Sequence, residues 1–321
     1  MNLPDPQLAR PGTLRPGGSS GTPVRKMALA LLLVAAMVGA AQEAGASTAI
    51  FPEFGALICG LVVLDLAAWK RRPGDLMIFP TTAALGAVLL NRLGAPYWAV
   101  DAVVFAFALG TLNLLGSAVV PTIGVGLLPV LLHYTSWAYP IAVGCWTTLL
   151  AVAVQLGSAK GRGAPTPGSS PGALPTLSFL LLGWGWSTAA WAVGERWLAV
   201  PPLLAAGYEL LQAGGAGAVR KSALLGVAAG IGAVARLALP WKVGAGAVSF
   251  LAVAGLARLA AVASPPAAAM SLLPLVLPRS AMAAFVWSSG IGSLLLLAVF
   301  AAAAGLRRRR SQSTSKFVSH R

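Results

Sequence analysis

The sequence predicts an all-α, polytopic membrane protein made of two tandem homologous repeats with about twelve helices. The chain has 321 residues, of which 57% are hydrophobic and only 10% charged, and its mean hydropathy is +0.80. Soluble domains carry about 25% charged residues. Continuous apolar runs of about 18–20 residues, long enough for a helix to cross a bilayer, recur along most of the chain. A β-barrel would instead alternate polar and apolar residues.

A pattern of prolines and small residues occurs twice. Leu-Leu-Pro-Val-Leu at 127–131 recurs as Leu-Leu-Pro-Leu-Val at 272–276, and Gly-Ala-Val at 86–88 recurs at 232–234. The offset between the copies is 149 residues early in the repeat and about 145 later, so one short deletion in the second copy restores the register. Repeated hydrophobic units are typical of transport proteins.

The repeat divides the chain into five parts. Stretches rich in Pro, Gly and Ser predict a disordered N-terminal tail and a flexible linker between the copies. Residues 25–46 also have the features of a cleavable signal peptide, but a retained helix is favoured because 176–194 fills the same place in the second copy. The parts are the tail 1–24, the first transmembrane repeat 25–156, the linker 157–175, the second transmembrane repeat 176–305 and a basic cytoplasmic tail 306–321.

Each copy contains one segment that is too short to cross a membrane alone. At 1.5 Å per residue, 121–133 and 266–277 reach only about 20 Å. Either they are buried among the other helices, which gives six crossings per copy and parallel repeats, or they re-enter, which gives ten helices plus two re-entrant pieces and inverted repeats. The other expected spans after the first helix are 51–69, 76–93, 98–119, 137–156, 176–194, 199–217, 222–239, 243–263 and 280–304.

The net charge of +15 comes mainly from cations near the predicted span ends. With six crossings per copy, most of these cations lie on one side of the membrane. The positive-inside rule therefore favours six crossings, both termini in the cytoplasm and a location in the cell inner membrane. Anionic lipid is the expected partner of the basic segments. No nucleic-acid partner is expected, because no folded basic face is indicated.

Neither catalysis nor cofactor binding is indicated by the sequence. It has no nucleophile elbow, no phosphate-binding loop and no HExxH zinc motif. Cys59 and Cys145 each stand alone in an apolar segment, and His133 and His320 lie far apart. We therefore expect no metal site, no cofactor and no enzyme activity, with the cysteines acting as small buried residues.

Polar side chains inside the predicted spans are candidates for a binding site, because each is costly in lipid and turns toward a cavity or a partner. Asn113 and Arg258 occupy equivalent positions in the two copies, and Glu209 lies near the centre of 199–217. We expect Glu209 to neutralise Arg258 or Arg236. The alternative is a structural ion pair, or an arginine that extends to the membrane surface.

Three carboxylates of the first copy have other expected roles. Asp65 and Asp101 lie nearer span ends, which favours an interfacial, solvated position over a proton relay. Glu53 stands at a helix start, where it can cap the helix and complement its dipole. The aligned residue in the second copy is Pro202, so any role of Glu53 belongs to one half.

Two segments that begin with proline form the sharpest motif, Pro121-Thr122-Ile123-Gly124 and Ser264-Pro265-Pro266. A proline in the first turn fixes a helix start, and free N–H groups at such an end can bind an anion. The alternative is a tightly packed, buried helix end. The expected substrate-binding residues are Pro121, Thr122, Gly124, Asn113, Ser264, Pro266, Arg258 and Glu209.

Four motifs of the first copy follow one another in a recognisable order. They are FPEFGAL at 51–57, PTTAALG at 80–86, the segment from Pro121 to Pro129, and TSWAYP at 135–140. In these motifs the chain resembles bacterial members of the HPP family of integral membrane proteins. The resemblance covers 50–156 directly and 199–300 through the internal repeat.

The HPP family is named for a His-Pro-Pro signature, and some of its plastid members are implicated in nitrite transport. This chain departs from the signature, since Val120-Pro121-Thr122 and Ser264-Pro265-Pro266 contain no histidine. The resemblance thus implies a divergent, internally duplicated membrane protein with a role in transport.

Together these observations predict a permease or transporter for a small solute or anion, with its site between the repeats. The alternative is a non-transporting membrane scaffold, or an assembly partner of another protein. An intramembrane enzyme is disfavoured, because the sequence contains no paired catalytic carboxylates and no His/Cys cluster. The substrate, the coupling ion and the oligomeric state stay open.

Overall fold

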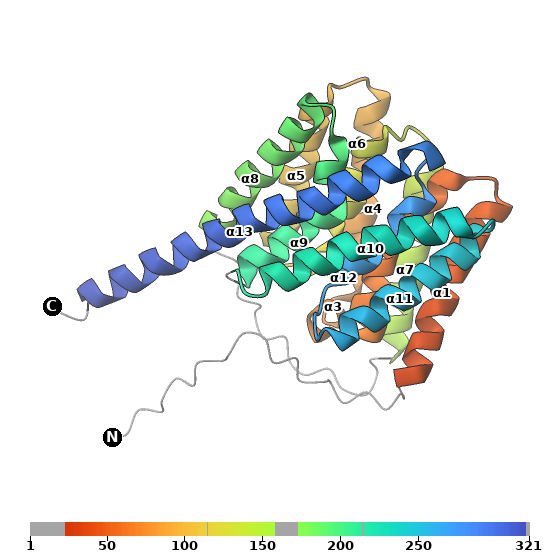
Figure 1. The fold of residues 1–321 in the computed structure, drawn as a ribbon, viewed down its shortest axis with the longest axis horizontal. Helices are drawn as coiled ribbons and strands as arrows, with labels where there is room; N and C mark the ends of the chain where they lie inside the picture. Colours follow the sequence, from red (N-terminus) through yellow and green to blue (C-terminus); the bar gives the residue numbers. More distant parts are fainter. Residues whose placement is uncertain (1–22, 114, 158–172, 214, 319–321) are drawn as a thin grey trace.

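The structure is a computed structural model that describes residues 23–113, 115–157, 173–213 and 215–318; of 173–175 and 307–318 only the backbone is described. Every regular element in the described ranges is a helix, and no strand occurs there (Figure 1). Six of these helices are long and apolar enough to cross a membrane. The predicted tail 1–24 and linker 157–175 fall largely outside the described residues, as does the end of the basic tail 306–321.

Prolines in the first turn begin several of the helices in both halves, as their fixed φ favours. The elements of the first half are α1 (Pro23–Glu43), η1 (Ser47–Ala49), α2 (Glu53–Ile58), the π-helical turn η2 (Cys59–Val63), α3 (Ala67–Lys70), α4 (Pro73–Arg92), α5 (Tyr97–Asn113), α6 (Pro121–Leu132) and α7 (Ala138–Gly157). Those of the second half are α8 (Ala173–Ala192), η3 (Arg196–Ala199), α9 (Pro201–Gln212), α10 (Ala218–Ala238), α11 (Lys242–Leu259), α12 (Pro265–Leu272), η4 (Leu273–Leu275), η5 (Arg279–Ala281) and α13 (Met282–Val318).

Three predicted spans are shorter or more divided than expected, and one of them, 199–217, is reduced to α9. The span 51–69 consists of α2, η2 and α3, because Asp65 has a left-handed backbone conformation, with φ 58°, that interrupts the helix. Such a conformation cannot continue a right-handed helix. The span 98–119 ends at Asn113, and Gly116, with φ 65°, forms part of the turn that follows.

The two halves pack in the same order. In the first half α4 lies against α6 and α7, and in the second α10 lies against α12 and α13. Contacts between the halves are reciprocal, since α1 packs on α11 and α8 on α5, while α2 packs on α12 and α9 on α6. Figure 1 shows the pair α1 and α11 at one edge of the molecule and the pair α5 and α8 toward the opposite edge. Helices in corresponding positions therefore make corresponding contacts.

The chain leading into and through α6 runs along the whole of α4. Near the start of α4, the Arg72 guanidinium donates a hydrogen bond to the Leu115 carbonyl oxygen at 2.8 Å. Near its end, the Asn91 side-chain amide donates to the carbonyl oxygens of Pro129 and Tyr134, at 2.9 and 3.0 Å. A re-entrant segment would return to the end of α4 at which it began, and this segment does not.

The short helices α6 and α12 are buried among the longer ones. All of α12 is buried, as is α6 from Pro121 to Leu131. Small residues allow this close packing: a Cβ added at Gly55 would lie 3.3 Å from the Ala268 carbonyl oxygen. Close approach at small residues is typical of helix packing in membranes. It agrees with the interpretation of the proline motifs as buried helix ends.

Large apolar side chains lie on the outer surface of the long helices. Leu32 of α1 is 65% exposed, Ile141 of α7 is 63% exposed and Leu294 of α13 is 61% exposed. Hydrophobic exposure of this extent on several helices is unfavourable in water, whereas lipid chains solvate it. The outer surface therefore agrees with a membrane environment.

A cluster of charges joins the start of α1 to the end of η2. Lys26 Nζ lies 2.9 Å from Asp65 Oδ2, and Lys70 pairs with the other oxygen of the same carboxylate. Asp65 thus lies at a span end, as expected. Its side chain is 13% exposed, so it is paired with cations rather than fully solvated.

Candidate functional site

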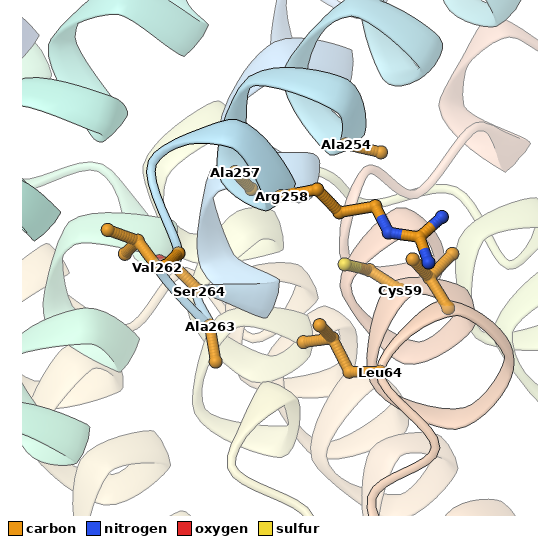
Figure 2. A pocket seen from close by; sticks show the side chains of 10 residues that line it. Cys59, Leu64, Ala254, Ala257, Arg258, Val262, Ala263 and Ser264 are labelled. Atoms are coloured by element: carbon orange, nitrogen blue, oxygen red, sulfur yellow. The ribbon is translucent and has the colours of Figure 1, made fainter. Parts of the chain in front are cut away.

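A cavity of about 290 Å³ lies between the two halves, near the ends of η2 and α11 (Figure 2). One wall comes from η2 and the residue after it, and the other from the last turns of α11 and the chain that leads to α12. The lining residues are Cys59, Val63, Leu64, Ala254, Ala257, Arg258, Ala261, Val262, Ala263 and Ser264. Arg258 therefore brings a positive charge into walls that are otherwise mostly apolar.

Arg258 extends from α11 across the cavity toward η2, on the side of Cys59 (Figure 2). It forms no salt bridge with any described residue. The expectation that Glu209 neutralises Arg258 or Arg236 is wrong, because Glu209 Oε2 lies 2.9 Å from Lys221 Nζ. A short turn joins α9 to α10 and brings this lysine to the carboxylate. Arg258 is itself exposed, so its guanidinium is open both to solvent and to a ligand in the cavity.

The start of α6 does not present the free N–H groups that were expected to bind an anion. Pro121 has no N–H, and the N–H groups of Thr122 and Ile123 donate to the Val119 and Val120 carbonyl oxygens, at 3.1 Å each. These two groups are therefore satisfied within the chain.

The start of α12 is closed in the same way. Pro265 and Pro266 have no N–H, and the Ala267 N–H donates to the Ser264 carbonyl oxygen at 3.0 Å. The Ser264 side chain makes no capping bond, and its buried hydroxyl has no hydrogen-bond partner among the described residues. A hydroxyl at the cavity, rather than free N–H groups, is what this helix start offers.

A second junction corresponds to the cavity by the alignment of the two halves. Cys59 aligns with Tyr208 at an offset of 149 residues, and Arg258 with Asn113 at an offset of 145. The Tyr208 hydroxyl donates to Asn113 Oδ1 at 3.3 Å. Its ring packs edge-on against Phe179, with centroids 5.0 Å apart. An aromatic side chain therefore occupies the place that Cys59 leaves open.

Glu53 does not have the capping role expected of it. The side chain makes no cap hydrogen bond, is 2% exposed, and turns inward against Gly124 of α6. Thr122, in the first turn of α6, likewise has a buried hydroxyl without a partner among the described residues. Two polar groups are thus buried in the first half without a structural partner.

The expectation of a solvated Asp101 is wrong, because its side chain is 1% exposed. Helix α8, which is distant in sequence, covers this part of α5. The Asp101 carboxylate forms a side-chain hydrogen bond with Ser187, whose hydroxyl lies 2.9 Å from the Tyr97 hydroxyl. This network joins the two halves.

The predicted site residues do not gather in one place. Arg258 and Ser264 line the cavity. Asn113 accepts a hydrogen bond from Tyr208, and Glu209 pairs with Lys221. The remaining residues lie at the starts of the two short helices, with Pro121, Thr122 and Gly124 in α6 and Pro266 in α12.

Sequence reasoning missed Cys59, which was expected to be no more than a small buried residue. Its alignment with Tyr208 was the available signal.

Comparisons with protein-family models, with curated proteins and with solved structures find no match. The fold itself defines the class, an all-helical membrane protein with six helices suited to cross a bilayer. Within the described residues, no group of three His, Cys, Asp or Glu side chains could hold a metal ion.

Proposed function

We propose that the protein is a permease for a small anion and that the cavity at Arg258 is its binding site. The observation that carries this proposal is an arginine with no acidic partner among the described residues, in a mostly apolar cavity between the halves. An unpaired guanidinium in such surroundings binds an anion through charge-assisted hydrogen bonds.

The other properties of the cavity fit the same ligand class. Ser264 also lines it, and its buried hydroxyl has no hydrogen-bond partner among the described residues. The volume of about 290 Å³ is close to the lower limit of ligand pockets, about 300 Å³. A small anion, rather than a bulky organic solute, therefore suits the site.

We also propose that the two halves are copies of one six-crossing unit in the same orientation. The reciprocal contacts and the course of the chain along α4 support six crossings per half. By the positive-inside rule, the protein then lies in the cell inner membrane with both termini in the cytoplasm. The motif order that resembles the HPP family supports a transport role.

A membrane scaffold is the second candidate function, and α13 is the observation that favours it. Figure 1 shows α13 projecting well beyond the other helices. A helix of 37 residues is about 55 Å long, whereas a bilayer core is about 30 Å thick. Co-purification of a stoichiometric partner, without anion flux, would support this function.

Anion uptake into proteoliposomes tests the permease. We expect uptake of at least one of nitrate, nitrite, chloride and formate. Arg258→Ala should lower it about tenfold or more, because a charge-assisted hydrogen bond contributes about 1.5–3 kcal/mol. Arg258→Lys should retain part of the uptake, since it keeps the charge but not the planar guanidinium.

Arg220→Ala is the matched control, because Arg220 is exposed at the start of α10 and does not line the cavity. It should leave uptake unchanged. Equal uptake by wild type and Arg258→Ala would contradict the proposed site. No uptake of any of these anions by the wild type would contradict the permease itself.

A further inference from the structure

Glu53 is a buried carboxylate that the proposed anion site does not use. It lies in the first turn of α2, is 2% exposed, and neither carboxylate oxygen has a hydrogen-bond partner among the described residues. The space for it exists because residue 124 is glycine: a Cβ there would lie 2.8 Å from Glu53 Cγ and 3.2 Å from Oε1. The packing thus accommodates this side chain, and what favours its ionised form is the backbone N–H of Glu53 itself rather than a cation.

Among the described residues, no basic side chain of the elements packed against α2 forms a salt bridge with this carboxylate. Tyr134 and Tyr139 are the ionisable neighbours that interact with it electrostatically, and the Tyr139 hydroxyl already donates to the Val125 carbonyl oxygen at 2.9 Å. Of the elements packed against α2, α12 has no ionisable side chain. The ionisable side chains of the others are Arg25, Lys26 and Glu43 at the ends of α1, His133 at the C-cap of α6, and Cys59 of η2.

A proton is the ligand that suits such a group. An isolated ionised carboxylate in an apolar interior is strongly unfavourable, and a bound proton removes the charge. A divalent ion such as Ca²⁺ takes about six to eight oxygen ligands, whereas the described residues contain no cluster of metal-binding side chains. Glu53 is therefore suited to bind a proton in this conformation and to release it where water reaches the carboxylate.

The carboxylate is close to the anion cavity along one stretch of helix. Glu53 begins α2, and Cys59 of the cavity wall begins η2, which continues α2 directly. Six residues of helix correspond to about 9 Å along the axis. A change at Glu53 can therefore reach the cavity through a single element.

We propose that Glu53 is the proton-binding group of the permease, loaded and released once per cycle together with the anion at Arg258. This inference rests on the proposed anion permease. One proton carried with one monovalent anion moves no net charge, so a pH gradient can drive accumulation of the anion. The second half has Pro202 in the aligned position, so each chain carries one such proton.

Two measurements in proteoliposomes test the inference. Counterflow of labelled nitrate or chloride measures the anion site alone, and both anions have no permeant acid form at neutral pH. Accumulation driven by an inward proton gradient, with a trapped pH-sensitive dye, measures the coupling. Glu53→Gln mimics the protonated acid, so it should keep counterflow within about twofold of wild type and lower gradient-driven accumulation about tenfold or more.

Asp101→Asn is the matched control, because Asp101 is also a buried carboxylate of the first half with Oδ2 unpartnered among the described residues, but it hydrogen-bonds to Ser187 and does not lie in the helical segment that leads to the cavity. It should retain both activities. Gradient-driven accumulation by Glu53→Gln at the wild-type level overturns the inference. So does wild-type anion uptake without proton entry, a result that needs no variant to fold. Absence of wild-type counterflow for nitrate, chloride, nitrite and formate alike would instead overturn the permease.

Discussion

Two junctions between the halves occupy equivalent places, and one is open while the other is filled. At the open junction, Cys59 of η2 and Arg258 of α11 line a cavity of about 290 Å³. At the filled junction, the aligned residues Tyr208 and Asn113 are hydrogen-bonded to each other. Corresponding helix contacts therefore surround a cavity at the open junction and a packed aromatic side chain at the filled junction.

Under the proposed duplication, this difference accounts for an anion site at the open junction. A small thiol in place of a phenol ring leaves space, and an arginine in place of an amide adds a charge. Tyr208 also packs on Phe179, which in turn stacks on Phe300 with centroids 5.4 Å apart. The filled junction thus contributes to the core, whereas the open one offers a binding site.

Filling the open junction should have the largest effect. Cys59→Tyr gives η2 the tyrosine that α9 has at the aligned position, Tyr208. It should lower anion uptake about tenfold or more, because the ring occupies the cavity. Cys59→Ser is the control, since it removes the thiol without adding volume, and it should leave uptake near wild type. Uptake into proteoliposomes measures both.

Ala254→Leu adds volume from the opposite wall and should lower uptake in the same way. Size-exclusion profiles identify any variant that fails through overpacking, which costs about 1–3 kcal/mol. Unimpaired uptake by a well-folded Cys59→Tyr protein would show that the cavity is not the anion site.

A pair of aligned glycines compares the packing of the two halves. A Cβ at Gly232 of α10 would lie 2.2 Å from the Ser271 carbonyl oxygen, whereas one at Gly86 of α4 has nothing within 4 Å. Gly232→Ala should lower the free energy of unfolding by about 1–3 kcal/mol, because backbone must shift. Gly86→Ala should be neutral, or stabilise by up to about 1 kcal/mol through helix propensity.

Unfolding of both variants in detergent measures this difference. Equal stability of the two would show that α10 and α12 can separate at little cost, contrary to the packing described here.

The smallest effect is expected at the filled junction. Tyr208→Phe removes the 3.3 Å hydrogen bond to Asn113 and the hydrogen bond with Gln212, so it should lower the free energy of unfolding by about 0.5–1.5 kcal/mol. Anion uptake should not change. A loss of uptake as large as that of Cys59→Tyr would indicate that both junctions serve transport.

The membrane class and the positions of most helices could be predicted, because apolar run length reports directly on the bilayer. The equivalence of Asn113 and Arg258, which the repeat predicts, stays a prediction. Partners could not be predicted: Glu209 pairs with Lys221, and α8 buries Asp101, because these contacts depend on how helices distant in sequence turn and tilt against one another. The helix interruption at Asp65 was not predicted, because the apolar run around this residue does not indicate its left-handed backbone conformation.

The π-helical turn η2, which forms one wall of the cavity, packs against the short helix α3. Trp69 of α3 packs so closely on Gly60 that a Cβ there would lie 2.2 Å from the indole ring. The same short helix ends at Lys70, which pairs with Asp65. The Trp69 indole ring thus connects the Lys70–Asp65 ion pair to the helical turn that carries Cys59 and Val63 of the cavity wall.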